Sequence, residues 1–442
     1  MLSGSRQSSP RRSTRGLLSL IGLLALATNL LYFKTIRNFD APDTPTYITP
    51  AFNLLQGHGF SDSLGRPETF RTPGYPLLIL PFLWAGVSLE YLVLFQHLLQ
   101  VLLVIGTTAA VFQISGSRKQ AWLAGILFSI DLPTLESTNL VLSETLFTIC
   151  FGIALWLIWS GSRAADQSHI ARIALSGLLA GASVLIRPIS LYFIFPAIVY
   201  LLLAGSRFRF LRVLVFTAAF ACFPFLWATR NYHQTDHFTI SSTAGLEMLC
   251  CRAAGVLALD DPGAFNDNLT RRRAQLEGAA CADLKALYGK DCTEIPVALK
   301  SDFFMHRARE IMLQHPVALV RLALRGAVLM WLDGGTSGFQ GITGINPHTA
   351  LRILLIYTVP ALGFAFIGLW RLWKSNRQLC YLVFLTLLYF VVVSSGGDTY
   401  SRHRVPVTPL YIMLIAAGID FAFGAKALEH AGNHQSPAPE QN

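Results

Sequence analysis

Long apolar blocks separated by short charged breaks run through most of the sequence, and they limit the possible folds more than any other feature. Nothing short of a membrane hides such blocks from water, because a helix of roughly 20 apolar residues crosses the hydrocarbon core of a bilayer. The charge content agrees, since 14% of the residues are charged against roughly a quarter in ordinary globular chains. We therefore predict an all-α integral membrane protein that crosses the bilayer many times.

The apolar blocks predict about ten transmembrane helices. They lie near residues 16–33, 90–113, 120–136, 140–160, 172–187, 188–205, 211–228, 351–370, 378–394 and 405–424. A further block, 317–332, carries Arg321 and Arg325 on one helical face with leucines opposite. We interpret this block as a helix lying flat in the membrane interface, and a chain of eleven spans is the alternative.

Lysines and arginines in short loops predict the orientation, because such loops stay in the cytoplasm. Residues 1–15 hold four arginines and no acidic residue, and alternate loops along the chain are basic as well. We place this tail, those loops and a disordered tail at 429–442 in the cytoplasm, with the transmembrane domain, 16–428, between the tails. Two segments, 34–89 and 229–350, then lie on the outer face.

The net charge of +10 does not by itself indicate a nucleic-acid partner. The basic residues lie between apolar blocks rather than on one clustered surface. We expect the lipid bilayer as a partner and no nucleic acid.

The large outer loop is polar, and we expect helices over 266–290 and 297–314. It also holds four of the seven cysteines, Cys250, Cys251, Cys281 and Cys292. An even number of cysteines in one extracytoplasmic loop predicts two disulfides. Since neighbouring cysteines rarely bond each other, we expect each of the first two to pair with one of the last two. A zinc site is less favoured, because the spacing lacks paired knuckles.

Ionisable residues gather at the predicted outer ends of the spans, where such groups are costly and therefore functional candidates. They are Asp40, Asp43 and Arg71 in the first outer loop, Asp131, Glu136 and Glu144 around the turn between the third and fourth spans, Arg187, Arg230, and Arg402, His403 and Arg404 before the last span. Carboxylates beside several arginines at this face indicate a cleft for an anionic, lipid-borne substrate.

Such a cleft suits the transfer of a sugar from a polyprenyl phosphate. The leaving group is already a stable phosphate anion, so arginines suffice to stabilise its growing charge. One carboxylate then takes the proton from the attacking hydroxyl, and attack from the opposite face inverts the anomeric centre. Glycoside hydrolysis differs, because its leaving group must be protonated by a second carboxyl group.

Several segments resemble the GT-C membrane glycosyltransferases, which include the protein O-mannosyltransferase-like enzymes and the lipid A aminoarabinose transferases. The first outer loop carries Asp43-Thr-Pro-Thr-Tyr47, Asn53-Leu-Leu-Gln-Gly57-His-Gly59-Phe-Ser61 and Phe70-Arg-Thr-Pro-Gly-Tyr-Pro76. The resemblance continues in Leu185-Ile-Arg-Pro188, Arg230-Asn-Tyr232 and Arg402-His-Arg-Val-Pro-Val-Thr-Pro409, and it covers nearly the whole chain. It implies a GT-C type fold in a bacterial inner membrane, with the active site facing the periplasm and the N-terminus in the cytoplasm.

The resemblance also implies roles for individual residues. In that family an acidic residue of the first outer loop acts as the base, which maps to Asp43, with Asp40 as its rival. Basic residues near the Pro-Gly-Tyr motif and before the final span contact the donor phosphate. These map to Arg71 and to either Arg402 or Arg404, the other of which we expect to be a surface charge.

Three further residues complete the candidate substrate-binding set: Tyr47, Glu144 and Arg187. Tyr47 fits an aromatic anchor at the membrane interface equally well, and Glu144 fits a structural partner of Arg187 equally well. Pro50 departs from the family pattern, because a proline interrupts a helix expected at this point. We expect the helix to restart at Pro50 behind a Thr49 cap.

The sequence indicates no certain cofactor. No His-x-x-x-His, Glu-x-x-His or Asp-x-Asp cluster stands out, so a divalent metal, which stays open, would need ligands from separate loops. The partners we expect are a polyprenyl-phosphate-linked sugar donor and a glycan, lipid or protein acceptor. A glycan ligase or polymerase using a lipid-diphosphate carrier is one alternative. A lipid-linked-sugar flippase, which would place more charge at mid-membrane, and an inactive scaffold are the others.

Overall fold

The structure is a computed structural model that describes residues 10–163, 170–205 and 208–432. Helices account for the secondary structure in these ranges, apart from an isolated antiparallel bridge between Ser61 and Pro67. The first helix begins inside the tail expected at 1–15, and the last continues into the tail expected from 429. The remaining residues of both tails, 1–9 and 433–442, lie outside the described ranges.

Seven of the described helices are long and apolar enough to cross a membrane, or eight if the bent pair α14–α15 is one span. They are α1 (Pro10–Thr35), α4 (Leu89–Ser115), α7 (Glu144–Ser162), α10 (Arg209–Thr235), α17 (Pro347–Ser375), α18 (Arg377–Ser394) and α19 (Thr408–Gly432). Each matches a predicted span, so the prediction of a multi-pass all-α membrane protein is confirmed. The other three predicted spans form shorter helices, so the expected number of about ten stays a prediction.

The predicted span 120–136 is divided in two by Asp131. Helix α5 (Arg118–Ser129) ends just before this residue, and α6 (Leu132–Asn139) begins just after it. The Asp131 carboxylate accepts a hydrogen bond from the backbone amide of Thr134 at 3.2 Å, so it caps α6. An N-cap starts a new helix rather than extending an old one, which explains the break in the apolar block.

The predicted spans 172–187 and 188–205 form short helices, because a proline lies between them. Helix α8 (Ile170–Ile186) has 17 residues and stops before Pro188. The chain then makes the 3₁₀ helix η2 (Pro188–Phe193) before α9 (Ile194–Leu203), which has 10 residues. Proline favours the start of a new helix over the continuation of the previous one.

The first loop, between α1 and α4, contains α2 (Thr44–Leu55) and α3 (Gly74–Trp84). Helix α2 runs through Pro50, so the expected restart at this residue is wrong. A proline in this place removes one backbone hydrogen bond. The helix is held from outside instead, because the Tyr47 ring packs edge-on against Tyr75 with 5.0 Å between centroids.

The large loop, residues 236–346, is also helical. It contains α11 (Thr243–Leu246), the π-helix η3 (Glu247–Ala253), α12 (Ala254–Ala258), α13 (Phe265–Tyr288), α14 (Val297–Gln314), α15 (Pro316–Leu332) and α16 (Thr336–Thr343). Helices α13 and α14 confirm the helices expected over 266–290 and 297–314. Helix α15 meets α14 at a bend of 103°, and its flat position in the interface stays a prediction.

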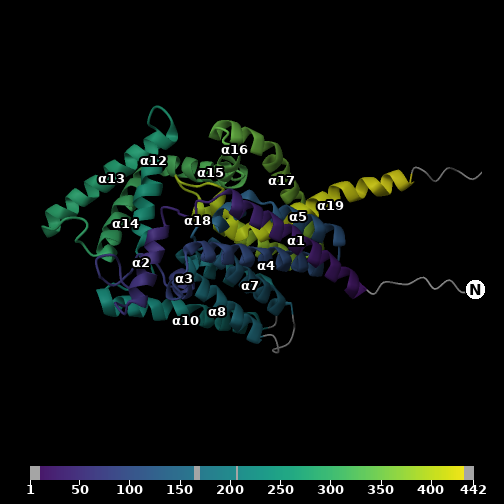
Figure 1. The fold of residues 1–442 in the computed structure, drawn as a ribbon, viewed down its shortest axis with the longest axis horizontal. Helices are drawn as coiled ribbons and strands as arrows, with labels where there is room; N and C mark the ends of the chain where they lie inside the picture. Colours follow the sequence, from purple (N-terminus) through teal and green to yellow (C-terminus); the bar gives the residue numbers. More distant parts are fainter. Residues whose placement is uncertain (1–9, 164–169, 206–207, 433–442) are drawn as a thin grey trace, which may run out of the picture.

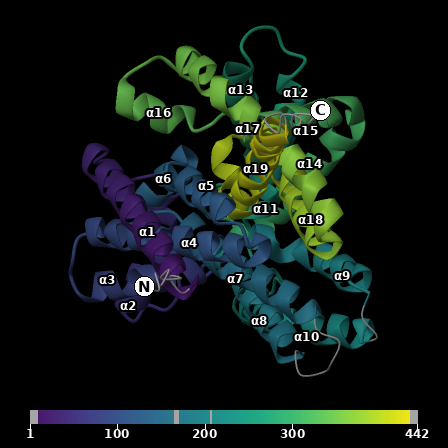
Figure 2. The same cartoon turned by 90° about the vertical axis from the view of Figure 1, so that its right-hand side faces the viewer.

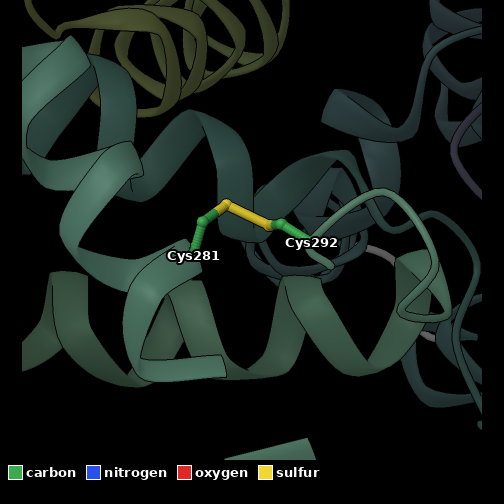
Figure 3. The surroundings of a disulfide bond; sticks show 2 residues. All are labelled: Cys281 and Cys292. Atoms are coloured by element: carbon green, nitrogen blue, oxygen red, sulfur yellow. A yellow bond between two sulfur atoms is a disulfide. The ribbon is translucent and has the colours of Figure 1, made fainter. Parts of the chain in front are cut away.

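The disulfide pairing differs from the expected one. Cys281 and Cys292 bond each other, as Figure 3 shows, with 5.2 Å between their Cα atoms. Cys250 and Cys251 are free thiols. The chain reverses direction after α13, which brings Cys292 back to Cys281 over a separation of 11 residues. One disulfide therefore replaces the two that the cysteine count predicts.

The helix bundle has two different ends (Figure 1). Helix α1 begins and α19 ends at one of them, whereas α2, α13 and α14 lie at the other, which we call the loop end. Viewed from the end that carries the start of α1, α8 and α10 lie side by side at the edge of the bundle (Figure 2). The shared end of α1 and α19 agrees with the side that the basic loops predict for both tails.

The core lies between the spans. Phenylalanines from three helices pack edge-to-face within it: Phe151 of α7 contacts Phe193 of η2 at 4.7 Å and Phe390 of α18 at 5.5 Å between centroids. At the loop end, η4 (Ser401–Val407) precedes α19 and carries the basic residues that the sequence singled out. The bundle thus brings η4 toward the first loop.

Candidate active site

Asp43 lies directly before α2 and is bound by two arginines from distant parts of the chain. Its Oδ1 accepts a hydrogen bond from Arg71 Nη2 at 2.6 Å, and its Oδ2 accepts one from Arg402 Nη2 at 3.0 Å. The side chain makes no capping hydrogen bond to α2. A third of it, 34%, remains exposed. The carboxylate is therefore held in place by cations while one side stays open to a reactant.

Arg71 donates one hydrogen bond from each of its three guanidinium nitrogens, to Asp43 and to the first turn of α2. Its Nε donates to Thr46 Oγ1 at 2.8 Å and its Nη1 donates to Tyr47 OH at 3.2 Å. The guanidinium also lies over the Tyr47 ring, 4.4 Å from the centroid. Such a fork fixes an arginine and its partners together. Arg71 therefore sets the position of Asp43 and neutralises part of its charge.

Glu144, the first residue of α7, shares Arg402 with Asp43 and adds a third arginine, Arg187. Its side chain is fully buried. Its Oε1 accepts a hydrogen bond from Arg402 Nε and lies 2.5 Å from Arg187 Nη1. Arg402 is thus shared between Glu144 and Asp43. Three guanidinium groups face two carboxylates in this cluster, which leaves one net positive charge to attract an anion.

The first loop is anchored to the turn between α6 and α7. Tyr47 OH lies 3.3 Å from Ser143 Oγ, and Thr44 Oγ1 donates to the Val141 carbonyl at 3.3 Å. The Val141 amide donates in turn to the Phe39 carbonyl at 2.9 Å. These contacts place the start of α2 over the buried end of α7, which explains how Asp43 and Glu144 reach the same arginine.

Glu68 supports Arg71 and was not found by sequence reasoning. Its Oε1 accepts hydrogen bonds from the backbone amides of Phe70 and Arg71 at 2.5 Å and 3.0 Å. Arg230, a candidate in the sequence, donates to the backbone carbonyls of Glu68 and Phe60, both at 2.8 Å. A carboxylate three residues before a candidate arginine was the available signal. Arg230 braces the first loop and does not reach Asp43.

The start of the large loop packs against the same segment. Ser241 Oγ donates to the Phe70 carbonyl at 2.7 Å, and the Ser242 amide donates to the Thr69 carbonyl at 2.8 Å. The two predicted outer loops therefore lie together at the loop end. The large loop thus holds the backbone of Thr69 and Phe70, directly before Arg71.

Arg404 lies outside the cluster, in a buried ion pair of its own. Its Nη2 donates to Asp131 Oδ1 at 2.8 Å, and its guanidinium lies 5.5 Å from the centroid of the Tyr411 ring. Only 2% of the side chain is exposed, so the expectation that one of the two arginines is a surface charge is wrong. The side chains of Arg402 and Arg404 leave η4 on different sides. Arg402 binds Asp43, whereas Arg404 is buried and binds Asp131.

Two other candidates have local partners. Glu136 Oε1 accepts a hydrogen bond from Ser337 Oγ at 2.6 Å, which ties α6 to α16. His403 Nδ1 accepts one from the Tyr400 amide at 3.5 Å, at the start of η4. Both residues flank the cluster without binding Asp43.

Electrostatics keep Asp43 ionised. Burial alone would raise the pKa of this carboxyl, but Arg71 and Arg402 outweigh burial and hold its pKa below the usual value of 3.8. Glu68 behaves in the opposite way, because burial raises its pKa in spite of the two backbone amides that donate to it. At neutral pH Asp43 is a carboxylate able to accept a proton.

Among the described residues, no group of three or more His, Cys, Asp or Glu side chains is arranged to hold a metal ion. The printed partners of the Asp43 carboxylate are the guanidinium groups of Arg71 and Arg402.

An apolar cavity of about 560 Å³ lies between α4, α7, α18 and α19. Leu103, Trp156 and Leu382 contribute to its wall, together with Pro406 of η4. Pro406 follows Arg402 by four residues. The charged cluster and a cavity of hydrocarbon character thus share the element η4.

Comparison with solved structures reveals the same architecture elsewhere. The archaeal oligosaccharyltransferase AglB from Archaeoglobus fulgidus, in complex with an inhibitory peptide and a dolichol-phosphate, aligns over 96% of this chain and 52% of its own, with 12% identity and a TM-score of 0.56. A structure of the Archaeoglobus fulgidus oligosaccharyltransferase tethered to an acceptor peptide aligns over 96% and 52%, with 13% identity and a TM-score of 0.55. The chain has a GT-C-like fold.

The GT-C-type chain spans about half the length of these oligosaccharyltransferases. ArnT from Cupriavidus metallidurans, bound to undecaprenyl phosphate, aligns over 96% of this chain and 81% of its own with 13% identity and a TM-score of 0.39. A scan of the sequence against protein-family models gives no match, and no curated protein matches it in sequence. At these identities the likeness to the oligosaccharyltransferases shows the fold alone.

Proposed function

We propose that this chain is an inverting membrane glycosyltransferase that moves a sugar from a polyprenyl-phosphate donor to a hydroxyl group on a glycan, a lipid or a protein. The carboxylate of Asp43 between two guanidinium groups carries the proposal, because it places a base beside groups that bind anions. The GT-C-type fold supports the same class of reaction. The dolichol-phosphate and the peptide belong to AglB, and they motivate the donor and the protein acceptor of the proposal.

The proposed step is a single displacement. The acceptor oxygen attacks the anomeric carbon of the sugar, and the bond from that carbon to the phosphate oxygen breaks. The electron pair stays on the phosphate, and the hydroxyl proton goes to the Asp43 carboxylate. Because the nucleophile enters opposite the leaving group, the anomeric configuration inverts. The leaving phosphate needs no proton, so one carboxylate suffices.

Arg402 and Arg187 are the proposed phosphate ligands, with the buried Glu144 holding both in place. A phosphate that takes the Nη2 group of Arg402 would remove one of the two counter-ions of Asp43. The pKa of Asp43 would then rise, since burial favours its neutral form. The carboxylate would become a stronger base when the donor is in place. Tyr47, held by Arg71, would contact the sugar or acceptor from the opposite side.

The apolar cavity supports a lipid-borne donor. Its volume of about 560 Å³ and its apolar lining suit part of an isoprenoid chain. With the phosphate at Arg402, the chain would pass Pro406 toward the cavity. The basic loops and the Cys281–Cys292 disulfide support a loop end that faces the periplasm of a bacterial inner membrane.

Mass analysis of cell-envelope glycans, lipids and proteins tests the proposal, in cells with and without this chain. We expect one product class to lose a single sugar residue, and the wild-type chain to restore it. The spent donor identifies the reaction: polyprenyl phosphate supports the proposal, whereas polyprenyl diphosphate indicates a glycan ligase or polymerase. Unchanged products, with donor moved across the membrane intact, indicate a flippase and contradict it.

A further inference from the structure

The loop 395–400 connects α18 to η4 and therefore determines where Arg402 lies. It is held by the large loop rather than by the spans alone. The Gly397 amide donates to the Cys251 carbonyl at 3.2 Å, and Arg252 Nη2 donates to the Val393 carbonyl at 2.6 Å, at the end of α18. On the far side of the loop, the Ser401 amide donates to Asp333 Oδ2 at 3.2 Å. Both ends of the loop are thus attached to residues of 236–346.

Asp398, at the middle of this loop, attaches the loop to α13 and η3. Its Oδ2 accepts a hydrogen bond from Arg273 Nη2 of α13 and one from Cys251 Sγ of η3 at 3.2 Å. Arg273 Nε also donates to the Cys250 carbonyl at 3.1 Å. One arginine therefore ties α13, η3 and the loop before η4 together.

Close glycine contacts show how tightly the loop is packed. A Cβ atom at Gly397 would lie 2.5 Å from the Cys251 carbonyl oxygen, and one at Gly326 would lie 2.9 Å from the Gly396 nitrogen. Such distances leave no room for a side chain, so backbone packs on backbone here. A shift of η3 or α15 would therefore move the loop as well.

We propose that Arg273 and Asp398 are a positioning pair that sets Arg402 for the transfer proposed above, so that the large loop controls the phosphate-binding end of the site. The inference rests on that proposed function. Arg402 lies four residues after Asp398 and contacts both Asp43 and Glu144. Release of the loop from α13 loosens Arg402, and with it the geometry of the base and the phosphate ligand.

The variant Arg273→Gln tests the pair, and Arg272→Gln is its matched control. Arg272 is the preceding residue of the same helix and pairs with Asp261 at 2.6 Å, away from the loop. We expect Arg273→Gln to lower kcat on the order of tenfold to a hundredfold, as a small misplacement of a catalytic group does. The control keeps the wild-type kcat. Exchanging the charges, Arg273→Asp with Asp398→Arg, restores at least part of it.

A pH profile separates positioning from general damage. The charged groups that face Asp43 are Arg71 of the first loop and Arg402 of η4, with Glu144 of α7 beyond Arg402. When Arg402 is loosened, Asp43 takes up a proton more readily, so the acid limb of kcat/KM moves to higher pH in Arg273→Gln. It stays in place in Arg272→Gln. Loss of kcat with an unmoved acid limb contradicts the proposal.

Hydrogen exchange gives a readout that does not need activity. The Gly397 and Ser401 amides both donate to residues of the large loop, so Arg273→Gln should quicken their exchange by at least about tenfold. Unchanged exchange overturns the pair. Asp398→Asn serves in the same measurement if Arg273→Gln does not fold. If no polyprenyl-phosphate donor is used at all, the proposed function fails while the exchange result still decides whether the pair holds the loop.

Discussion

Asp43 is a carboxylate with two counter-ions, and this sets how its activity should depend on pH. Because its pKa lies below 3.8, the acid limb of kcat/KM should lie below that pH. A base with a lowered pKa works above it and stops working as the pH falls through it. Arg71→Gln removes one counter-ion, so the acid limb should move to higher pH.

The matched control for this pH measurement is Arg66→Gln. Arg66 lies in the same loop and pairs with Asp62 at 2.8 Å, without contact to Asp43. Its acid limb should match that of the wild type. Equal profiles for Arg71→Gln and Arg66→Gln would contradict the role of Arg71.

Arg402 and Arg404 should respond differently to substitution. Arg404→Met leaves Asp131 as an unpaired buried charge, which costs about 3–5 kcal/mol of stability. We expect poor recovery of folded protein in detergent, measured by thermal unfolding. The double variant Arg404→Met, Asp131→Asn should recover it, because asparagine can still cap α6.

Arg402→Met should leave folding nearly intact and raise KM for the donor. The opposite pattern, with Arg404→Met raising KM at unchanged stability, would make Arg404 the phosphate ligand. The sequence could not separate these two arginines, since both lie in one motif. The 3₁₀ geometry of η4, which turns their side chains to different sides, is not visible in the residue pattern.

For other residues of the site, too, the sequence predicts only part of what the structure shows. Asp43, Arg71 and Arg402 are recognisable from their motifs, and Glu144 and Arg187 from charge at the ends of apolar blocks. Glu68 accepts a hydrogen bond from the nearby backbone amide of Phe70. Ser143 contacts the hydroxyl group of Tyr47, which lies far away in sequence. Such residues carry no compositional signal.

At the scale of elements, the packing of α17 on α19 depends on two glycines. A Cβ atom at Gly368 would lie 1.9 Å from the Leu414 carbonyl oxygen, and one at Gly418 would lie 2.0 Å from that of Phe364. Small residues let transmembrane helices approach closely. Gly368→Ala should therefore destabilise the protein by about 1–3 kcal/mol, as overpacking does.

Thermal inactivation in detergent measures this effect, with Gly363→Ala as the control. Gly363 lies on the same helix, and no atom comes within 4 Å of a Cβ placed there. The control should match or exceed the wild type in stability, because alanine favours helix over glycine. Equal stability of the two variants would show that α17 and α19 pack less closely than described.

The elements were predictable where an apolar block is long and unbroken. The seven long helices coincide with predicted spans, whereas a capping residue such as Asp131 divides a block that composition alone reads as continuous. Helix α2 shows the converse. Its proline predicts a break, but contacts of Tyr47 and Arg71 from outside the helix hold it together. A local cap explains the first case, and tertiary contacts explain the second.

At the scale of the whole molecule, the thiols report the fold of the large loop. One disulfide and five free cysteines are described. Alkylation of denatured, non-reduced protein should therefore modify five thiols, and reduction should add two. Three modified thiols before reduction would restore the two disulfides that the cysteine count predicts. Mass spectrometry distinguishes these results directly.

The overall architecture was predictable because the bilayer imposes it through hydropathy and loop charge. The pairing of cysteines was not, since it depends on how the chain reverses after α13. The meeting of the first loop and η4 at Asp43 follows from packing between α7, η4 and the first loop. Sequence motifs predict which residues matter, and the bundle determines which of them meet.

The most direct test of the account is transfer by Asp43→Asn in membrane vesicles supplied with a radiolabelled polyprenyl-phosphate sugar. Asparagine keeps the size of the side chain but cannot take the acceptor proton. We expect transfer to fall on the order of a hundredfold to ten-thousandfold, with normal membrane insertion and retained binding of the donor. Transfer at the wild-type rate would show that Asp43 is not the base and would contradict the proposed mechanism.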